Sequence, residues 1–372
     1  MHWNILSWWF FATQGANSSG QLGINSKCDS QKEPVEVPLS HTTLLPENIK
    51  QIAGGGSHTL ILDVNGHVFC SGSNSKGQLG SPDGKLTFEQ IDLLREFTVT
   101  QISCGWDFSC AITNNGKMFV WGNNNYTQLG LGKSITSTSI PSRVQLSIKL
   151  AVSFKQASCG LRHSAFLNEI NNVLVAGSGS KGQLGISNNF NDENYMSIAK
   201  VNIIDDIKSV ACGQHHTLAL RSDGTVYSWG ENKHGQLGLD PVCTRNSFVP
   251  CVAFIDSHIK EIHAGWTHSA ALTEDGSVYT WGRSNFGQLG SQRLAPHKPE
   301  KLTGFNFKQI SLGSEHSLAV TNNSELFAWG WNEHGSCVND PQHVIPSPRQ
   351  LFKNQTVKVA FACTGHSFAV VE

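Results

Sequence analysis

Histidine is the residue type whose spacing most suggests chemistry in this chain of 372 residues. An imidazole is a common metal ligand and a common general acid or base. A catalytic or metal site is needed only once, however, whereas these histidines recur at a nearly constant interval. We therefore expect buried rings that bond the backbone at turns, with no catalytic residue, no metal and no cofactor. Six of them end a G-x-x-H tetrapeptide or a close variant: His58, His163, His216, His268, His316 and His366.

Other side chains that could do chemistry are also repeated or isolated. Ten cysteines are spread singly without a C-x-x-C pair, which argues against a metal cluster or a disulfide framework and indicates a reducing compartment. Cys104, Cys159 and Cys212 each precede a glycine of the repeat, where we expect inert, buried thiols. The G-Q-L-G segments lack the lysine and the following helix of a phosphate-binding loop. The sequence therefore does not indicate an enzyme that performs covalent chemistry.

The two positions between the glycine and the histidine vary while their frame repeats, and variable loop positions usually carry recognition. Trp106 and Trp266 combine a large area with few rotatable bonds, and Arg162 and Glu315 add charge, a composition typical of binding hot spots. The alternative is a solvated rim without a partner. The candidate partner-binding residues are Trp106, Asp107, Arg162, Gln214, His215, Trp266, Thr267, Ser314 and Glu315.

The elements that position these loops repeat with them. The tetrapeptides end at positions 58, 108, 163, 216, 268, 316 and 366, with Phe108 in place of histidine, so successive copies are 48 to 55 residues apart. Within a copy, two segments of alternating polarity flank a short turn, which in four copies is an Asn-Gly or Asp-Gly pair. This pattern predicts a β-hairpin whose two turn residues both have positive φ.

The number and length of the copies predict the architecture. No sustained helical periodicity occurs, so helices are expected only as short pieces in connections. Four-stranded sheets of this length must stack to bury both faces, and radial closure protects their edges. We therefore predict an all-β fold, a seven-bladed β-propeller of four-stranded antiparallel blades, as a single domain over residues 1–372.

The two chain ends are expected to share a blade. Residues 366–371 resemble a second strand, and the third strand of that blade is then predicted at the N-terminus. Residues from about 5 to 15 would pair with residues from about 366 to 371 and close the ring. Gln14 then takes the position that holds a tryptophan in other third strands, where the ring is expected to fill the wedge between blades. Those tryptophans are Trp121, Trp229, Trp281 and Trp329.

Composition limits the partners. The chain has 27 Lys plus Arg against 28 Asp plus Glu, so nothing in its net charge favours nucleic acid or an anionic membrane surface. Its longest apolar runs are shorter than a membrane-spanning helix requires, and residues 1–12 lack the basic start and cleavage site of a signal peptide. We expect a soluble, intracellular monomer without membrane insertion.

The combination of G-x-x-H, D-G, W-G and G-Q-L-G in this order resembles the regulator of chromosome condensation family, and the resemblance extends over essentially the whole chain. It implies a propeller that acts as a guanine nucleotide exchange factor for, or another regulator of, a small GTPase. Stretches such as residues 104–108 and 329–335 are similar to a secretion-linked branch of this family. That similarity implies a role in secretion, a link to an exocyst component, and a location in the cytoplasm and the nucleus.

The resemblance also implies roles for single residues. Exchange factors of the family place acidic residues in the G-x-x-H loops, and Asp107 is the best positional match, followed by Glu315. The even repeat leaves no room for a long extra hairpin and the chain has no basic tail, so a chromosome-bound exchanger is not expected. A non-catalytic interaction scaffold in trafficking remains an equal alternative. An ultraviolet-B photoreceptor is disfavoured, because the G-W-R-H-T repeats of that branch are absent.

Overall fold

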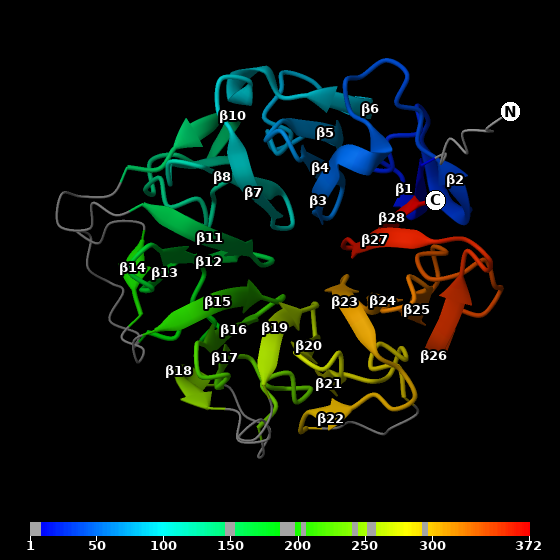
Figure 1. The fold of residues 1–372 in the computed structure, drawn as a ribbon. Coiled ribbons are helices and arrows are strands. Elements are labelled where there is room, and N and C mark those ends of the chain that lie inside the picture. The colour runs from blue at the N-terminus through cyan, green and yellow to red at the C-terminus, as the bar shows by residue number, and fades with distance from the viewer. Residues whose placement is uncertain are drawn as a thin grey trace, which may run out of the picture.

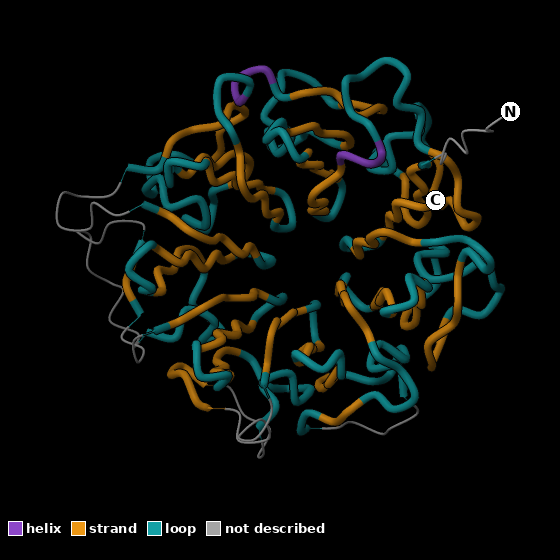
Figure 2. Tube along the Cα trace, viewed as in Figure 1, coloured by secondary structure: helices purple, strands orange, loops and turns teal. Residues whose placement is uncertain are grey.

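The computed structural model describes residues 9–145, 153–186, 198–201, 206–239, 245–250, 258–291 and 297–372. Seven four-stranded antiparallel sheets surround a central axis, as Figure 1 shows, and they confirm the predicted seven-bladed propeller. Loops and two single-turn 3-10 helices, η1 (Pro46–Asn48) and η2 (Asp92–Leu94), join the strands (Figure 2). No described helix is long and apolar enough to cross a membrane.

Each blade is a meander that begins at the axis and ends at the rim. The innermost strands are β3 (Ile49–Gly54), β7 (Val99–Cys104), β11 (Phe154–Cys159), β15 (Ile207–Cys212), β19 (Ile259–Ala264), β23 (Phe307–Leu312) and β27 (Val357–Ala362). The second strands are β4 (His58–Asp63), β8 (Phe108–Thr113), β12 (His163–Asn168), β16 (His216–Arg221), β20 (His268–Thr273), β24 (His316–Thr321) and β28 (His366–Val371).

The outer half of each blade completes the sheet. The third strands are β5 (Val68–Gly72), β9 (Met118–Asn123), β13 (Val173–Gly177), β17 (Val226–Gly230), β21 (Val278–Gly282), β25 (Leu326–Trp331) and β1 (Phe10–Asn17). The fourth strands are β6 (Lys85–Gln90), β10 (Ser137–Arg143), β14 (Ala199–Lys200), β18 (Arg245–Pro250), β22 (Glu300–Lys301), β26 (Val344–Leu351) and β2 (Cys28–Glu36).

The N-terminal strand closes the ring, as the sequence predicts. β1 pairs with β28 from Phe10 opposite Val371 to Gly15 opposite His366, and with β2 on its other side. The strand begins at Phe10 rather than near residue 5, and residues 1–8 lie outside the described residues. Termini far apart in sequence therefore meet in one blade, which leaves no sheet edge exposed between the first and last copies.

The hairpin turns differ from the expected type. In the turn after β4, the amide of Gly66 donates to the carbonyl of Asp63 at 3.2 Å, and only Gly66 has positive φ, at 88°. The same holds for Gly276 after β20, with φ of 83°. The prediction of two positive φ angles was wrong, because a type I turn followed by one left-handed glycine also matches the twist of a hairpin.

Tryptophans of the third strands fill the wedges between blades, as predicted. All four are fully buried. The indole Nε1 of Trp121 donates to the carbonyl of Gln78 in the G-Q-L-G loop of the preceding blade at 2.8 Å, and Trp229, Trp281 and Trp329 do the same to the equivalent glutamines. Gln14 replaces this donor in the last blade, since its Nε2 donates to the carbonyl of Cys337 at 2.8 Å.

The repeated histidines form a second set of bonds between blades. Each is buried, and its Nε2 lies 2.7 to 3.4 Å from a serine or threonine hydroxyl on the next blade. Each hydroxyl donates its own proton to the carbonyl of a G-Q-L-G or equivalent loop, so the histidine Nε2–H is the donor between them. The prediction that these histidines are buried and maintain the structure is confirmed. Their predicted acceptor was wrong, because a side-chain hydroxyl rather than a backbone carbonyl receives the bond.

Candidate protein-binding face

The meander places the variable loops on one side of the ring. The connection after each innermost strand, which holds the G-x-x-H tetrapeptide, and the G-Q-L-G connection after each third strand lie at the same end of the blade. The turn after each second strand lies at the opposite end. We call the first side the GxxH face. All nine candidate residues belong to loops on this face, grouped around the axis.

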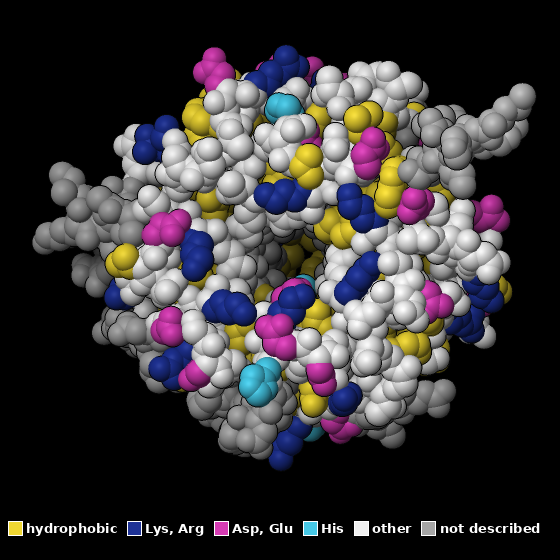
Figure 3. Space-filling view, viewed as in Figure 1, with side chains coloured by type: hydrophobic (Ala, Val, Ile, Leu, Met, Phe, Trp, Pro, Cys, Tyr) yellow, Lys and Arg dark blue, Asp and Glu magenta, His cyan; other side chains and the backbone are white. Residues whose placement is uncertain are grey.

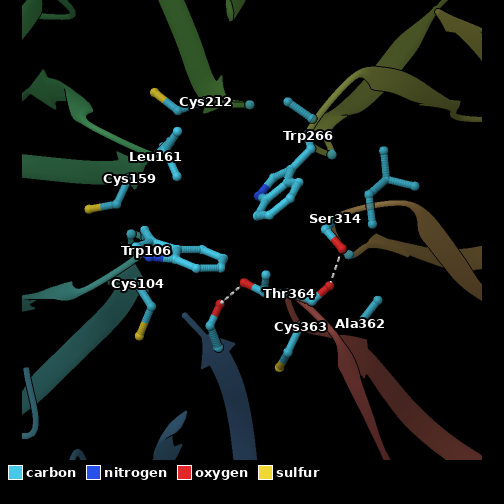
Figure 4. Close-up of a pocket in the computed structure, with 18 residues that line it drawn as sticks. Cys104, Trp106, Cys159, Leu161, Cys212, Trp266, Ser314, Ala362, Cys363 and Thr364 are labelled. Atoms are coloured by element: carbon cyan, nitrogen blue, oxygen red, sulfur yellow. Dashed lines mark hydrogen bonds between the residues drawn. The ribbon is translucent and has the colours of Figure 1, made fainter. Parts of the chain in front are cut away.

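Trp106 and Trp266 meet across the axis, although they belong to the second and the fifth blade. Their ring centroids are 5.3 Å apart and their planes are tilted by 48°, and Figure 4 shows both indoles directed into the same hollow. The hollow has a volume of about 110 Å³ and is lined by the glycines of the tetrapeptides and their neighbours. Trp106 is 41% exposed, one of the largest exposed apolar side chains among the described residues.

The backbone holds this mouth together with bonds that run from loop to loop. The amide of Gln214 donates to the carbonyl of Trp266 at 3.1 Å, that of Trp266 to Ser314 at 2.9 Å, and that of Gly56 to Trp106 at 2.8 Å. A side chain at Gly56 would collide with the indole, because its Cβ would lie 2.7 Å from Trp106 Cδ2. The glycine is therefore what allows Trp106 to lie over the axis.

The charged candidates flank the tryptophan pair. Asp107 is partly exposed, and its Oδ2 accepts a bond from Asn123 Nδ2 at 2.7 Å, which fixes the carboxylate beside Trp106. Arg162 is exposed, and its guanidinium lies 4.5 Å from the ring centroid of Tyr126. Both side chains keep polar groups free to reach a partner.

Gln214 and His215 continue the face on the fourth blade, where both are half-buried. Burial lowers the pKa of His215 from its usual value, and the nearby carboxylate of Glu231 opposes this shift only in part. Glu231 also lies 3.5 Å from Lys181 Nζ. His215 is therefore neutral at physiological pH, and it presents a hydrogen-bonding ring rather than a charge.

Three of the candidates are not available as contact residues. Thr267, Ser314 and Glu315 are 5%, 7% and 4% exposed. Glu315 Oε1 accepts a bond from Thr267 Oγ1 at 2.8 Å and Oε2 accepts one from Gln288 Nε2 at 2.6 Å, while Arg283 Nη1 lies 3.7 Å away. Burial raises the pKa of Glu315, against the effect of these donors. The expectation that Glu315 projects toward a partner is corrected here: its carboxylate joins the fifth and sixth blades.

The cysteines expected to be buried lie around the hollow, and their sulfur atoms point away from its centre (Figure 4). Cys159 and Cys212 are buried and Cys104 is partly exposed, and Cys363 joins them at the mouth (Figure 4). Burial raises the pKa of Cys159 to about 11 and that of Cys212 to about 12, so both thiols stay protonated and unreactive. Within the described part of the chain, no group of three or more His, Cys, Asp or Glu residues could hold a metal ion.

One residue of this face was missed by the sequence analysis. Tyr126 precedes the T-Q-L-G segment of the second blade and is 39% exposed, beneath the guanidinium of Arg162. The signal was present, because the residue before G-Q-L-G also varies while its frame repeats. The sequence alone does not place the two loop types on one face, so it does not predict this second variable position as a contact residue.

The fold is a seven-bladed propeller whose G-x-x-H loops carry exposed aromatic and charged side chains around the axis. The chain belongs to the RCC1-like domain family, whose model matches residues 11–371. It is 31% identical to the secretion-regulating guanine nucleotide exchange factor of Mus musculus over 77% of this chain and 62% of that protein. It is 32% identical to the ultraviolet-B receptor UVR8 of Arabidopsis thaliana over 74% of this chain and 61% of that receptor.

Solved structures agree on the fold. Prp20p of Saccharomyces cerevisiae, a structure described together with its binding to Gsp1p and histones, superposes with a TM-score of 0.86 at 24% identity, over 98% of this chain and 91% of that chain. Human WBSCR16 gives a TM-score of 0.81 at 23% identity, over 98% and 99% of the two chains. At these identities the superpositions support the architecture alone. The chain spans about three fifths of the length of the mouse and plant relatives.

Proposed function

We propose that this protein regulates a small GTPase, which it binds through the GxxH face, and that it accelerates the release of bound guanine nucleotide. Its similarity to proteins named as exchange factors supports this proposal. The name of those relatives also supports a role in secretion. An exocyst component as a further partner, and a location in the cytoplasm and the nucleus, belong to the same proposal.

The observation that carries the proposal is the tryptophan pair at the axis. Trp106 and Trp266 form a rigid aromatic platform of 5.3 Å centroid spacing, surrounded by partly exposed Asp107, Arg162 and His215. Aromatic anchors with a polar rim are the usual composition of a binding hot spot. The hollow beneath the indoles holds only about 110 Å³, which is smaller than the several hundred Å³ typical of small-ligand sites. The face therefore fits a protein surface better than a nucleotide.

Exchange would depend on Asp107. A small GTPase holds its nucleotide through a phosphate-binding loop, a lysine and Mg²⁺. A carboxylate brought close to that lysine or metal competes with the phosphates and weakens nucleotide binding. Asp107 is held beside the aromatic platform by Asn123 and is partly exposed, which is the placement this step requires.

The experiment is a nucleotide-release assay on a panel of small GTPases loaded with fluorescent GDP. Catalytic amounts of the protein are expected to accelerate release from at least one of them. Asp107→Asn should abolish most of the acceleration and retain binding, whereas Trp106→Ala should weaken binding by at least about tenfold, since hot-spot truncation typically costs about 2 kcal/mol or more. Val64→Ala, at an exposed site on the opposite face, is the matched control and should behave as the unmodified protein.

A non-catalytic scaffold in trafficking is the second candidate. Burial of Glu315 favours it, because one of the two acidic groups that exchange could use is not on the surface. Binding of a GTPase that depends on Trp106, without faster release at any concentration of the protein, would establish the scaffold and reject exchange. If Trp106→Ala binds every partner as the unmodified protein does, the GxxH face is not the binding surface for either proposed function.

A further inference from the structure

A lysine occupies the same position in the innermost strand of six of the seven blades. It is the second residue of the strand, and the pairing register breaks there: in β3, Ile49 lies opposite Asp63 and Gln51 opposite Leu62, which leaves Lys50 as an extra residue. Such a bulge redirects the unpaired side chain. All seven innermost strands show the same break. The residues at the bulge are Lys50, Thr100, Lys155, Lys208, Lys260, Lys308 and Lys358.

These six lysines, which we call the lysine ring, encircle the axis on the side opposite the GxxH face. The bulge lies at the start of each innermost strand, whereas the G-x-x-H loop follows its end. Lys260 and Lys308 are half-buried and the other four are exposed. Figure 3 shows basic side chains arranged around the central hollow of this face. Closure of the propeller therefore gathers a once-per-blade residue into a ring of lysines around the axis on one face.

The lysine ring is poorly neutralised. Lys260 Nζ lies 3.1 Å from Glu261 Oε1, and no other member of the ring forms an ion pair with a described residue. The remaining ammonium groups bond neutral oxygens instead, and each ammonium has three donors, so donors are left for a ligand. Their partners are the carbonyl of Thr100 for Lys50, Asn171 Oδ1 for Lys155, the carbonyl of Lys260 for Lys208, Ser324 Oγ for Lys308 and the carbonyl of Glu47 for Lys358.

Such an arrangement has an electrostatic cost in the absence of a ligand. Like charges on one face repel one another, and for Lys308 it is partial burial, not a neighbouring charge, that lowers the pKa. The chain as a whole has a formal net charge of −1, so acidic residues elsewhere in the sequence offset the lysines of this ring. A bound polyanion would remove the repulsion and use the donors that the ring leaves free.

We propose that the lysine ring binds a compact polyphosphorylated small molecule of the inositol polyphosphate class, either free or as the headgroup of a lipid. Lysine acts on phosphate as a point charge, whereas planar carboxylates are recognised best by the fork of arginine, and the ring contains no arginine. A closed ring of cations fits a compact ligand centred on the axis. Single-stranded nucleic acid would instead require a basic groove that follows its backbone, together with aromatic side chains for its bases.

The test uses inositol hexakisphosphate as the probe, added to the full chain in isothermal titration calorimetry at about 0.15 M salt. We expect saturable binding of one molecule per chain. The triple variant Lys155→Gln, Lys208→Gln, Lys308→Gln should bind at least about tenfold more weakly, since three charge pairs are lost. The matched control removes three exposed lysines outside the ring, Lys32→Gln, Lys76→Gln and Lys133→Gln, and should retain the affinity.

The outcomes separate the ligand classes. Vesicles with and without phosphatidylinositol bisphosphate form a second arm, and ring-dependent binding to the former assigns the ligand as a lipid headgroup, whereas binding of the soluble probe alone assigns it as free. No binding, or an equal loss in both triple variants, would overturn the proposal. So would tighter ring-dependent binding of an acidic peptide or of single-stranded DNA than of the probe. Release assays on the GxxH face are independent of this result, because the two sites lie at opposite ends of the axis.

Discussion

The GxxH face and the opposite face, which carries the lysine ring and which we call the lysine face, are built from the same seven blades, yet their informative residues follow opposite rules. On the GxxH face, the repeated histidines are buried between blades, and the variable positions Trp106 and Arg162 are exposed. On the lysine face, the exposed and charged position is itself the repeated one. Repetition therefore does not by itself mark a residue as structural. What decides is burial: the repeated histidines are enclosed between blades, whereas the repeated lysines stay exposed or half-buried even where they bond the next blade.

The largest effect should follow from opening the ring, because both faces depend on closure. Deletion of residues 1–17 removes β1 and exposes the edges of β28 and β2, and it also removes buried Phe11, whose ring stacks on buried Phe368. We expect loss of cooperative unfolding and aggregation, measured by thermal melting and size-exclusion chromatography. Deletion of residues 1–8 removes none of the residues of β1 and serves as the control. An unchanged melting transition after the longer deletion would show that the blade does not need this strand.

Acid should be the next strongest perturbation, through the histidines behind the GxxH face. Burial lowers the pKa of His58, His163 and His216 to about 3. Their Nδ1 atoms have no hydrogen-bond partner, so an added proton would have no acceptor. The unfolded chain takes up protons at a pKa near 6.5, so stability is fully present above that pH and falls as the pH drops toward 3. Each histidine contributes a slope of up to about 1.4 kcal/mol per pH unit.

Urea unfolding between pH 7.5 and pH 4.5 measures this slope. His216→Phe copies the residue that the second blade carries naturally at Phe108, and Ser269 keeps its bond to the carbonyl of Gln236. The pH dependence of the unfolding free energy of this variant should be smaller by the contribution of one histidine. A flat stability profile across this range would mean that the histidines are protonated in the folded protein.

The buried carboxylate of Glu315 tests which residues of the GxxH face stabilise the fold and which contact a partner. Glu315→Ala leaves the donors of Thr267 and Gln288 without an acceptor, which should lower the free energy of unfolding by about 1–3 kcal/mol. Glu315→Gln retains one acceptor and should cost less. Chemical denaturation of the two variants measures the difference. If Glu315→Ala is as stable as the unmodified protein and yet loses partner binding, then Glu315 is a contact residue after all.

The smallest effect is expected on the lysine face. Lys155→Gln and Lys208→Gln each remove an exposed cation from a set of like charges, so stability without ligand should stay within about 0.5 kcal/mol or rise slightly. Thermal melting at low and at moderate salt measures this, and the gain should shrink with salt. A decrease of several degrees in the melting temperature of either variant would instead show that these lysines stabilise the fold, as the histidines do.

The repeat alone predicted much of the molecule. Period, hairpin signals and W-G strands are local properties of the chain, and they were sufficient for the seven blades, the closing strand and the buried tryptophans. Gln14 was located at a tryptophan position by register alone, and the structure shows it making the equivalent bond to the preceding loop. The hairpin turn type was wrong because two turn geometries share the Asn-Gly or Asp-Gly signal, and the choice depends on the flanking register.

Only the tertiary structure decided which side chains meet. Trp106 and Trp266 are 160 residues apart in sequence, and they touch because ring closure brings the loops of the second and fifth blades to one axis. The sequence predicts Glu315 as an exposed loop carboxylate, but in the fold it is buried and accepts bonds from Thr267 and Gln288 of the neighbouring blade. The balanced net charge gave no indication that six lysines would lie on one face. A sequence fixes what each copy contains, whereas the distances between copies arise from packing the sheets around a common centre.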